Sequence, residues 1–517
     1  MKIFKIMGWS SALCLSLITL QAQETNEVGQ LKKQLQQMQD SFEKVTRAQQ
    51  QQIEALTKKL DEFTKTQSAP SIAAPKTEEQ KKLEAQLAAE LSKDSATNSA
   101  LTESALKKPW SASDPIRVLG SGSSYLNVSL DGLFAAGGST ATDIPSLQLG
   151  GHDPNQRGFT VQNVEAVFEG FVDPYFRGQA NIVYQIDAEG ASAVELEEAY
   201  AESLSLPGNL QLKAGQYFTE FGRLNPTHPH AWSFVDLPLV SGRFLGGDGL
   251  RNPGARLSWL MPTPFYSELF LSVQNSHGET AESFRNEHEG EPFLGRVNNV
   301  GRVKSFGDLL FTPRYATSFD LSDTQTLLLG ASGAFGPNAS GVDTDTQIFG
   351  VDLFWKWKPA NHHGGFPFVS WQTEAMLRKY QAGAFSNIGD DTDSNGAIDN
   401  GEADLFGDGL IHNAPRETLT DYGFYSQLAY GFRKGWVANL RGEYVTRSNA
   451  AEYEKLYGDD SDRLARWRIS PNLTWYPSEF SKLRLQYNYD HWQFSDTEHS
   501  IWLQLEFLLG SHGAHKF

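Results

Sequence analysis

Apolar and polar residues alternate with a period of two along most of the chain, from about residue 116 onward. In the run 501–509 (IWLQLEFLL) every odd position is apolar, and in the run 482–490 (KLRLQYNYD) charged and amide residues take the even positions. Successive side chains of a strand point to opposite faces, so this period predicts strands with one apolar and one polar face. Sixteen such strands are predicted, near residues 124–135, 160–172, 177–187, 193–206, 210–215, 254–261, 265–274, 309–320, 325–335, 349–357, 367–379, 422–432, 436–444, 464–476, 482–490 and 501–509.

Together these strands predict an all-β transmembrane barrel of about 16 antiparallel strands at residues 116–517. An apolar face opposite a charged face is typical of strands that turn one side to lipid and the other to a polar lumen. Single-chain bacterial barrels have an even strand number, and about 16 strands enclose an aqueous channel. A soluble β-sandwich shares the alternation, but it would hardly need so many strands, an export signal and the terminal aromatic Phe517 together.

The N-terminal segment predicts export. Lys2 and Lys5 precede an apolar stretch, and Ala22 is a small residue suited to cleavage, so residues 1–22 are interpreted as a signal peptide. Cys14 is the only cysteine and lies inside that peptide, so the mature chain has no disulfide and no thiolate metal site. Export and a barrel together predict location in the outer membrane of a Gram-negative cell, in contact with outer-membrane lipid.

Residues 24–66 have a helical period and predict an α-helical coiled coil in front of the barrel. The apolar seam is narrow and restarts at Ile53 after a shift of four residues. A parallel homo-trimer is favoured, and a single amphipathic helix on the barrel rim is the alternative. Residues 67–115 are interpreted as a linker with a weak helix. Because an even strand number puts both ends of a barrel on one side, the coiled coil is expected in the periplasm. The seam residues are Val28, Leu31, Leu35, Met38, Phe42, Val45, Ile53, Leu56, Leu60 and Phe63.

The charge of the mature chain is concentrated in the barrel. The net charge is −18 for the whole chain, and removing Lys2 and Lys5 makes it −20. Residues 24–109 hold 13 acidic and 13 basic residues, so the barrel and its loops carry the whole excess. An acidic channel mouth favours cations. Nucleic-acid binding is not expected, because there is no basic patch to meet phosphates.

The most distinctive segments of the barrel are residues 218–232 (FTEFGRLNPTHPHAW) and 246–254 (GGDGLRNPG). They resemble the phosphate-selective porin O/P superfamily and its relatives, and the ending 510–517 (GSHGAHKF) is similar to endings in that group. Some members of the group are labelled zinc-regulated outer-membrane receptors. The resemblance covers roughly residues 115–517 and implies a trimeric, 16-stranded channel for small solutes. It does not transfer the substrate, because the phosphate-specific members rely on a lysine- and arginine-rich lumen and this barrel has no comparable basic run.

Residues 391–402 (DTDSNGAIDNGE) match the twelve-residue loop that binds calcium in EF-hands. Alternate residues of such a loop point oxygen atoms inward, a glycine at the sixth position makes the sharp turn, and a glutamate closes the shell with both oxygens. Flanking helices are not evident, so a single weak Ca²⁺ site in a long external loop is expected, and a merely solvated acidic loop is the alternative. The predicted ligands are Asp391, Asp393, Asn395, the Ala397 carbonyl, Asp399 and Glu402.

The histidines give a weaker metal signal. His228 and His230 form a His-x-His pair in a proline-rich turn, which offers Zn²⁺ two ligands where a site needs three or four. No third ligand is identifiable from the sequence, so Zn²⁺ is disfavoured and these residues are interpreted as turn and rim histidines. The pair 362–363, His512 and His515 are interpreted in the same way.

Catalysis is not predicted. The sequence has no His-Glu-x-x-His helix, no phosphate-binding Gly-Lys-Ser/Thr loop and no nucleophile elbow. Paired acids such as Glu197 and Glu198 are expected at this composition. The protein is therefore not expected to be an enzyme.

The hypothesis from the sequence is an outer-membrane porin for passive diffusion of small hydrophilic solutes or ions. Arg441, Glu443, Lys482 and Arg484 occupy polar positions of predicted strands and are expected to line the pore, narrowed by long loops that fold inward. A first alternative is an outer-membrane receptor or transporter for a metal or an anion such as zinc or phosphate. A second is a structural tether between outer membrane and cell wall through the coiled coil. The sequence names neither the solute nor the constricting loop.

Overall fold

In the computed structural model the chain divides into two compact units, Met1–Pro109 and Trp110–Phe517. The described residues all belong to the second unit. The predicted signal peptide (1–22), the coiled coil (24–66) and the linker up to residue 114 lie outside the described residues. The described residues are 115–121, 124–171, 173–186, 190–286, 290–299, 301–399, 402–494 and 497–510.

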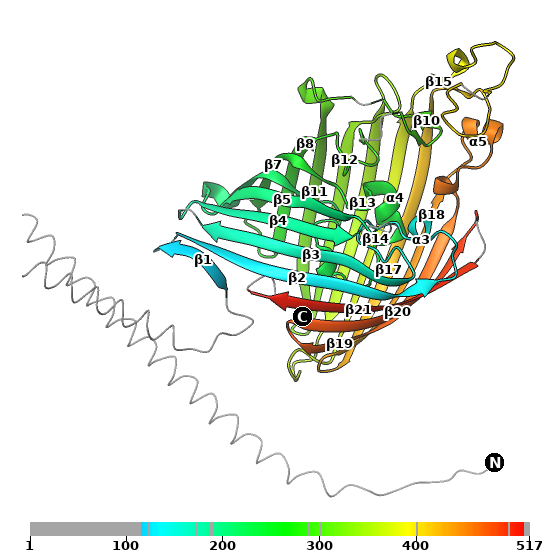
Figure 1. The fold of residues 1–517 in the computed structure, drawn as a ribbon. Helices are drawn as coiled ribbons and strands as arrows, with labels where there is room; N and C mark the ends of the chain where they lie inside the picture. The colour runs from blue at the N-terminus through cyan, green and yellow to red at the C-terminus, as the bar shows by residue number, and fades with distance from the viewer. Residues whose placement is uncertain are drawn as a thin grey trace, which may run out of the picture. The chain divides into compact units, whose positions relative to one another are not determined.

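Strands make up most of the described unit (Figure 1), and its helices are short. No helix among the described residues is both long and apolar enough to cross a membrane. The strands are β1 (Ile116–Ser121), β2 (Ser124–Ser139), β3 (Gly158–Phe171), β4 (Phe176–Ile186), β5 (Ser192–Ser203), β6 (Leu210–Phe218), β7 (Arg251–Leu260), β8 (Tyr266–Asn275), β9 (Pro292–Phe293), β10 (Arg296–Val297), β11 (Leu309–Ser322), β12 (Gln325–Pro337), β13 (Asp345–Trp357), β14 (Phe368–Ala382), β15 (Phe385–Ser386), β16 (Asn413–Ala414), β17 (Glu417–Arg433), β18 (Trp436–Arg447), β19 (Arg466–Ser478), β20 (Ser481–Trp492) and β21 (Thr497–Leu509). The helices are α3 (Ile144–Leu147), α4 (Leu239–Leu245) and α5 (Glu452–Tyr457), with 3₁₀ turns η1 (Pro207–Asn209), η2 (Pro229–Ala231), η3 (Phe306–Asp308), η4 (Ile388–Asp390) and η5 (Ser461–Arg463).

The long strands form a closed antiparallel barrel of 16 strands. Each pairs with the next long strand along the chain, and β21 returns to pair with β2, from Leu130 opposite Leu509 to Ser139 opposite Ser500. The seventeenth strand of the sheet, β1, is not part of the ring, because it pairs only with residues 124–128 at the start of β2. The predicted barrel of about 16 antiparallel strands is therefore confirmed, with each strand near its expected residues.

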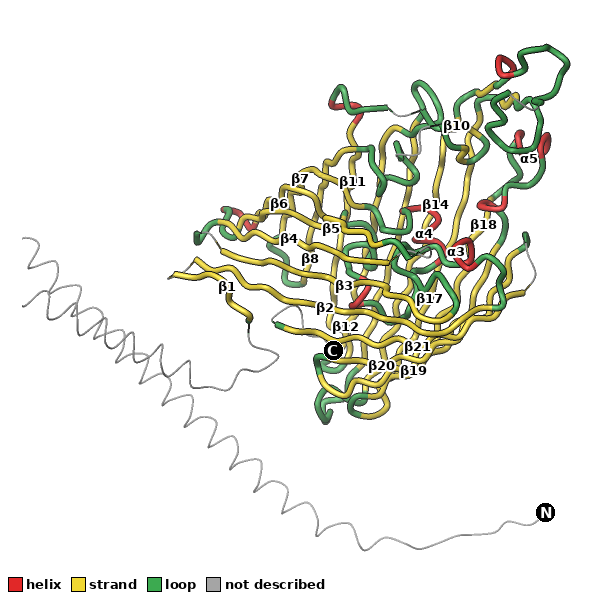
Figure 2. The backbone as a smooth tube through the Cα atoms, in the orientation of Figure 1, coloured by secondary structure: helices red, strands yellow, loops and turns green. Residues whose placement is uncertain are grey.

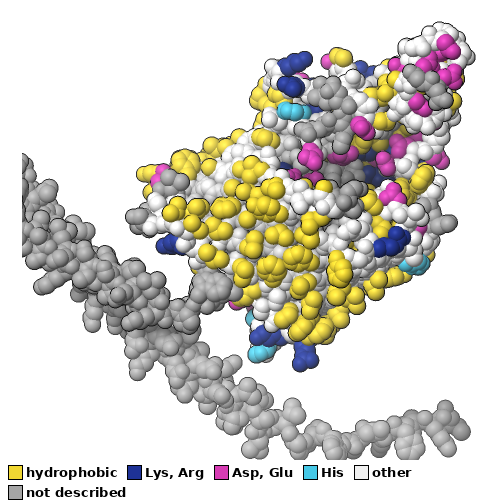
Figure 3. Space-filling view, viewed as in Figure 1, with side chains coloured by type: hydrophobic (Ala, Val, Ile, Leu, Met, Phe, Trp, Pro, Cys, Tyr) yellow, Lys and Arg dark blue, Asp and Glu magenta, His cyan; other side chains and the backbone are white. Residues whose placement is uncertain are grey.

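The side chains of the wall divide by chemistry as the alternation predicts. On β20 and β21 the outward-pointing Leu485 and Leu503 are each 49% exposed, whereas the inward-pointing Arg484 and Gln504 are 1% exposed. Figure 3 shows hydrophobic side chains gathered over the outer face of the barrel. A soluble protein buries apolar residues and exposes charged ones, so this inverted distribution is typical of a wall immersed in lipid.

The two ends of the barrel differ. One end has short turns, such as 434–435 between β17 and β18, and carries exposed aromatic residues including Phe176, Tyr266 and Trp475. The other end has long connections, visible as loop tube above the strands in Figure 2. Short turns at one end, long loops at the other and aromatic girdles are the organisation of outer-membrane barrels.

One long connection, residues 219–250 between β6 and β7, lies inside the barrel, and we call it the inward segment. Its helix α4 packs against the inner face of β14, β17 and β18. Phe221, Val240 and Phe244 are fully buried and form an apolar core with inward-pointing residues of the wall such as Ile348 and Tyr425. The packed core of this protein is thus inside the cylinder, and it fixes the segment against one wall.

Candidate functional site

A buried carboxylate holds the inward segment to the wall. Asp236 Oδ1 accepts a hydrogen bond from Arg441 Nη2 at 2.5 Å, and its Oδ2 accepts one from Arg468 Nη1 at 2.9 Å. Gln486 and Asn488 of β20 donate to the same carboxylate at 2.8 and 2.6 Å. Burial raises the pKa of Asp236, but the two guanidinium groups outweigh it and hold that pKa below its ordinary value. The carboxylate is therefore ionised, and four side chains of the wall fix it.

The four residues predicted to line the pore all lie on the inner face of the barrel and contact the inward segment. Glu443 Oε2 accepts the backbone N–H of Leu239 at 2.6 Å, at the start of α4. Arg484 donates to the carbonyl of Trp232 at 2.8 Å, and Lys482 donates to that of His230. With Arg441 on Asp236, these side chains position residues 230–239. Each is at most 4% exposed, because the segment and neighbouring side chains of the wall cover it.

Charge changes sign around the inner wall. Inward positions of β18, β19 and β20 carry mostly cations, beside Glu443 and Asp490, whereas inward positions of β21, β2, β3 and β5, farther around the ring, carry carboxylates. The inward segment contacts both stretches. The cations are Arg441, Arg466, Arg468, Lys482 and Arg484, and the carboxylates are Glu506, Asp131, Glu165, Glu195, Glu197 and Glu198.

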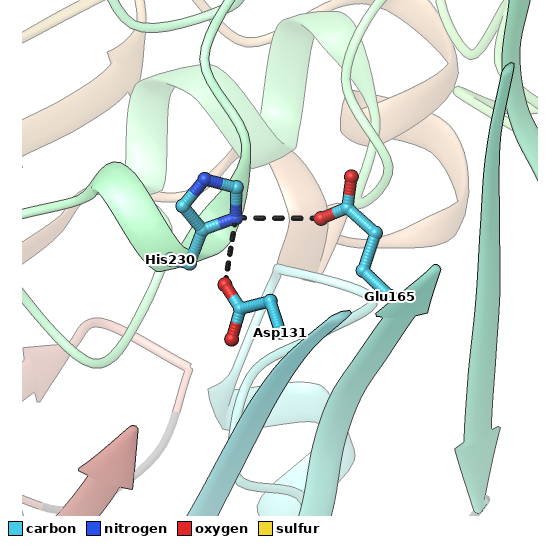
Figure 4. Close-up of side chains that lie close together, drawn as sticks. All are labelled: Asp131, Glu165 and His230. Atoms are coloured by element: carbon cyan, nitrogen blue, oxygen red, sulfur yellow. Dashed lines mark ion pairs between the residues drawn. The ribbon is translucent and has the colours of Figure 1, made fainter. Parts of the chain in front are cut away.

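Three histidines lie along the carboxylate stretch, and the first of them is His230 (Figure 4). Its Nδ1 lies 3.0 Å from Asp131 Oδ2 on β2 and 3.3 Å from Glu165 Oε2 on β3. The next is His228, whose ring stacks on that of His230 with centroids 5.6 Å apart. His228 Nδ1 lies 2.7 Å from Glu197 Oε2 and 3.4 Å from Glu165 Oε1.

The third histidine, His152, comes from the connection between β2 and β3. Its Nε2 lies 3.9 Å from Glu197 Oε1 and 3.7 Å from Asp248 Oδ1 of the inward segment. Two glutamates are therefore shared between neighbouring histidines. Glu197 lies between His152 and His228, and Glu165 lies between His228 and His230. We call the whole set the histidine–carboxylate row: Asp248, His152, Glu197, His228, Glu165, His230 and Asp131.

Two β-bulges shape this row. On β5 the register against β4 slips between Leu196 and Glu198, so Glu197 is an extra residue, and both Glu197 and Glu198 are buried. On β3 a similar slip makes Gln162 an extra residue, buried like the adjacent Asn163. A bulge interrupts the alternation of faces and re-aims side chains, and bulges are over-represented next to active sites.

The electrostatics of the row favour positive charge. Burial lowers the pKa of His228, but the carboxylates of Glu165 and Glu197 outweigh it and raise that pKa well above its ordinary value. Burial also lowers the pKa of His230, but Asp131 and Glu165 outweigh it and raise that pKa above its ordinary value. Four groups of at least three potential metal ligands occur among the described residues, and three of them belong to this part of the lumen: Asp131, Glu165 and His230; Glu165, Glu197 and His228; and His152, Glu195 and Asp248.

The end of the row at His152 opens on a cavity. The cavity is lined by His152, Glu197 and Asp248 together with apolar residues such as Phe218 and Trp232. The row is therefore reached from a polar corner of an otherwise largely apolar cavity.

The fourth ligand group is the predicted calcium loop, in the connection between β14 and β17 at the long-loop end of the barrel (Figure 1). Asp391, Asp393 and Glu402 bring one oxygen each within 4.8 Å of one another. Glu402 Oε1 accepts from the Thr392 N–H at 2.6 Å, so the closing glutamate folds back over the start of the loop.

The predicted turn of this loop is also present. Gly396 has φ of 93°, a conformation that side chains rarely allow, and its N–H donates to Asp391 Oδ2 at 3.0 Å. Asn395 Nδ2 donates to Asp393 Oδ2 at 3.1 Å and to Asp399 Oδ2 at 2.5 Å, while Ala397 N–H donates to Asn395 Oδ1 at 2.9 Å.

The histidine–carboxylate row is the part of the site that the sequence analysis did not identify. The His-x-His pair was noted, but its partners lie on three separate strands, far from it in the chain. One local signal was available. In residues 194–199 (VELEEA) the alternation of faces breaks at Glu197 and Glu198, and such a break in a barrel strand indicates a bulge.

Comparison with known proteins gives a distant sequence relative and several solved barrels. No family model matches the chain. The chain is 28% identical over 397 residues to an uncharacterized protein of Aquifex aeolicus (strain VF5), covering 72% of this chain and 75% of the relative. Among solved structures it is similar to the outer membrane channel DcaP of Acinetobacter baumannii (TM-score 0.46, 11% identity, 75% of this chain and 99% of that one). It is also similar to Pseudomonas putida OprB (TM-score 0.44, 10% identity, 74% and 94%) and to Salmonella typhi OmpF in complex with daunomycin (TM-score 0.40, 12% identity, 75% and 98%). The fold assignment rests on the strand pairing.

Proposed function

We propose that the protein is an outer-membrane porin through which small hydrophilic solutes or ions diffuse down their gradients. The observation that carries the proposal is a closed wall of 16 strands with apolar side chains outside and charged side chains inside. In lipid every backbone polar group must be satisfied within the protein, and a closed barrel meets that demand because it has no free sheet edge. The resemblance of residues 218–254 to the phosphate-selective porin O/P superfamily supports the same function.

The inward segment acts as the constriction of this channel. It is clamped to the wall by Asp236 and packed through Val240 and Phe244, so it narrows the lumen without depending on a bound partner. The segment lies between the cationic and the acidic stretches of the inner wall. A solute that passes it is therefore exposed to a strong electric field across the channel.

We expect cations to pass more readily than anions. The barrel carries the negative excess of the mature chain, and acidic side chains gather at the long-loop end in Figure 3. The cations of β18–β20 are neutralised by buried partners such as Asp236, Asp490 and Glu506. The carboxylates around the histidines have fewer arginine and lysine partners, so these carboxylates dominate the electric field in the lumen.

The assembly proposed is a homo-trimer with the short turns in the periplasm. β2 begins and β21 ends at the short-turn side of the barrel, so a coiled coil at residues 24–66 would emerge into the periplasm. The long loops, including residues 391–402, would face the outside of the cell.

The test is single-channel conductance of the purified mature protein in planar lipid bilayers. Stepwise openings that close in groups of three, with a reversal potential on the cation side in asymmetric KCl, are expected. The absence of any conductance in potassium, sodium and calcium salts would overturn the proposal.

We further propose that residues 391–402 bind Ca²⁺. The observation that favours this is the folded loop itself, with the sharp turn at Gly396 and Glu402 closing onto Thr392. An isolated extracellular site of this kind binds with a Kd on the order of 10⁻⁴–10⁻³ M. Because every predicted ligand is an oxygen, the loop suits a hard cation.

Calorimetric titration of the purified protein with Ca²⁺ tests this second proposal. The double variant Asp391→Asn and Glu402→Gln should lose the binding heat. Asp404→Asn is the matched control, because Asp404 accepts hydrogen bonds from Gly407 and Gly409 in the same connection but lies outside the motif. Equal binding by the wild type and the double variant would refute the site.

A further inference from the structure

At His152 two carboxylate oxygens face one ring nitrogen inside the protein. His152 Nδ1 lies 3.1 Å from the carbonyl oxygen of Gln162, which can only accept, so Nδ1 donates there and Nε2 is the nitrogen left to bind a ligand. That nitrogen faces Asp248 Oδ1 at 3.7 Å and Glu197 Oε1 at 3.9 Å. None of these three atoms has a hydrogen-bond donor among the described residues. Buried acceptors that converge in this way repel one another unless a cation lies between them.

Two further groups of histidine and carboxylate atoms lie along the row, each with its ligand atoms within 4.8 Å of one another, a spacing that suits a metal ion. Ligand atoms about 2.0–2.1 Å from a tetrahedral Zn²⁺ ion lie about 3.3–3.4 Å apart. His230 Nδ1 lies 3.0 Å from Asp131 Oδ2 and 3.3 Å from Glu165 Oε2. His228 Nδ1 lies 2.7 Å from Glu197 Oε2 and 3.4 Å from Glu165 Oε1. The two oxygens of Glu165 thus face two different histidines, as the oxygens of a bridging carboxylate do.

The residues behind the ligands orient them. His228 Nε2 lies 3.1 Å from Glu198 Oε2, and Glu198 Oε1 accepts the backbone N–H of Phe218 at 3.0 Å. When a metal ion replaces the proton on Nδ1, a proton held on Nε2 leaves the Nδ1 lone pair directed toward Glu165 and Glu197. Metal-binding histidines almost always donate their second N–H to a carboxylate or a carbonyl in this way. Gln162 performs the equivalent role for His152, and both supporting residues stand at the two β-bulges.

The row has more carboxylates than arginines and lysines that pair with them. Six carboxylates surround the three histidines: Asp131, Glu165, Glu195, Glu197, Glu198 and Asp248. Arg251 contacts Glu195 and lies 3.7 Å from Glu197, and Lys482 is held by Glu506. A divalent ion at a histidine and two carboxylates would neutralise both acids.

We propose that the histidine–carboxylate row binds divalent transition-metal ions in neighbouring sites that share carboxylates. One site is Asp131, Glu165 and His230, and the next is Glu165, Glu197 and His228, bridged by Glu165. His152 with Glu195 and Asp248 forms the end that faces the cavity. Imidazole together with carboxylate oxygen suits Zn²⁺, Co²⁺, Ni²⁺ or Cu²⁺, whereas Ca²⁺ and Mg²⁺ prefer oxygen alone. The site does not depend on the proposed porin function.

The experiment is a count of bound Co²⁺ on purified full-length mature protein in detergent. The protein is stripped with a chelator, dialysed against Co²⁺ with Ca²⁺ in excess to occupy oxygen-only sites, and analysed by elemental analysis and visible absorption. The wild type should bind at least two Co²⁺ ions per chain, with the intense d–d absorption of low-coordinate Co²⁺, and Zn²⁺ should displace them. Fewer than two ions per chain would overturn the shared sites.

Variants separate the row from the rest of the lumen. Glu165→Gln removes the bridge and should lower the count by at least one ion, and His152→Gln should lower it at the cavity end. Glu202→Gln is the matched control, because Glu202 is a buried glutamate of the same strand as Glu197 that pairs with Arg177 instead. Circular dichroism with retained heat-modifiable migration in gels shows that each variant has folded. A folded Glu165→Gln protein with the wild-type metal count would refute the proposal.

Discussion

The guanidinium of Arg441 donates to the carboxylate of Asp236 at 2.5 Å, joining β18 to a residue 205 positions earlier on the inward segment. Both side chains are at most 1% exposed. Arg468 binds the other oxygen of the same carboxylate, so one acid neutralises two arginines on neighbouring strands. The inward segment is therefore tied to the wall at a point that no solvent screens.

Removing this carboxylate should destabilise the barrel. Asp236→Asn removes one of the two buried carboxylates that pair with each of Arg441 and Arg468, which keep Glu443 and Asp490. Breaking a buried pair by removing one partner costs about 3–5 kcal/mol. The free energy of unfolding in lipid vesicles, followed by tryptophan fluorescence in urea, measures the loss. Asp459→Asn breaks the exposed pair with Arg447 and should cost no more than about 1 kcal/mol. Equal effects of the two variants would contradict the clamp.

The apolar core inside the cylinder makes a second prediction. Phe244 is fully buried in α4, and Arg378 lies over its ring. Phe244→Ala should reduce the free energy of unfolding by about 3–5 kcal/mol, because it leaves a cavity where the segment meets the wall. Val342→Ala, at an 85% exposed loop position, should change it by less than about 0.5 kcal/mol. A Phe244→Ala protein as stable as the Val342→Ala protein would mean that the segment is not packed.

The outer surface of the barrel gives a third prediction. Leu503 lies in the middle of β21 and points outward, so Leu503→Arg places a charge in the hydrocarbon and should cost about 2–4 kcal/mol in vesicles. Leu206, exposed in the turn after β5, lies near the interface, and Leu206→Arg should cost about 0–1 kcal/mol. The comparison is made by urea unfolding in vesicles of one lipid. A larger cost at Leu206 would place the membrane elsewhere on the barrel.

A fourth prediction concerns the residue behind His228. Glu198 does not belong to the proposed ligand set but holds His228 Nε2 at 3.1 Å. Glu198→Gln should weaken Co²⁺ binding by about 10–100-fold while leaving the number of ions at saturation unchanged, because it disturbs the orientation and basicity of a ligand and removes none. Titration of the stripped protein with Co²⁺ gives both numbers. A lower count at saturation would instead make Glu198 a ligand.

Much of the fold could be predicted because the side chains of a barrel strand alternate between lipid and lumen, so that apolar and polar residues alternate along the sequence. The charged even positions from Lys482 to Asp490 lie inside and the leucines and tyrosines between them outside, as the alternation indicates. The calcium loop was equally accessible to sequence reasoning, because its proposed ligands fall within twelve consecutive residues. Local patterns of this kind need no knowledge of which strands meet.

The histidine–carboxylate row required that knowledge. Asp131 and His230 are almost one hundred residues apart, and only the register of β2 against β3 together with the inward course of residues 219–250 brings them to 3.0 Å. Glu197 and Glu198 looked like an ordinary acidic pair, since their shared direction depends on one extra residue in β5. Arg441, Lys482 and Arg484 were expected in the lumen, but their clustering with Arg466 and Arg468 depends on which strands are neighbours.

The short strand β1 has a consequence for the seam of the barrel. β21 covers β2 only from Leu130 onward, so residues 124–128 would otherwise offer bare N–H and C=O groups beside the place where first and last strands join. Exposed groups of this kind invite a foreign strand to add on. By folding back over them, residues 116–121 shield the wall against unwanted edge-to-edge association, and they do so with the stretch of chain that leads into the barrel.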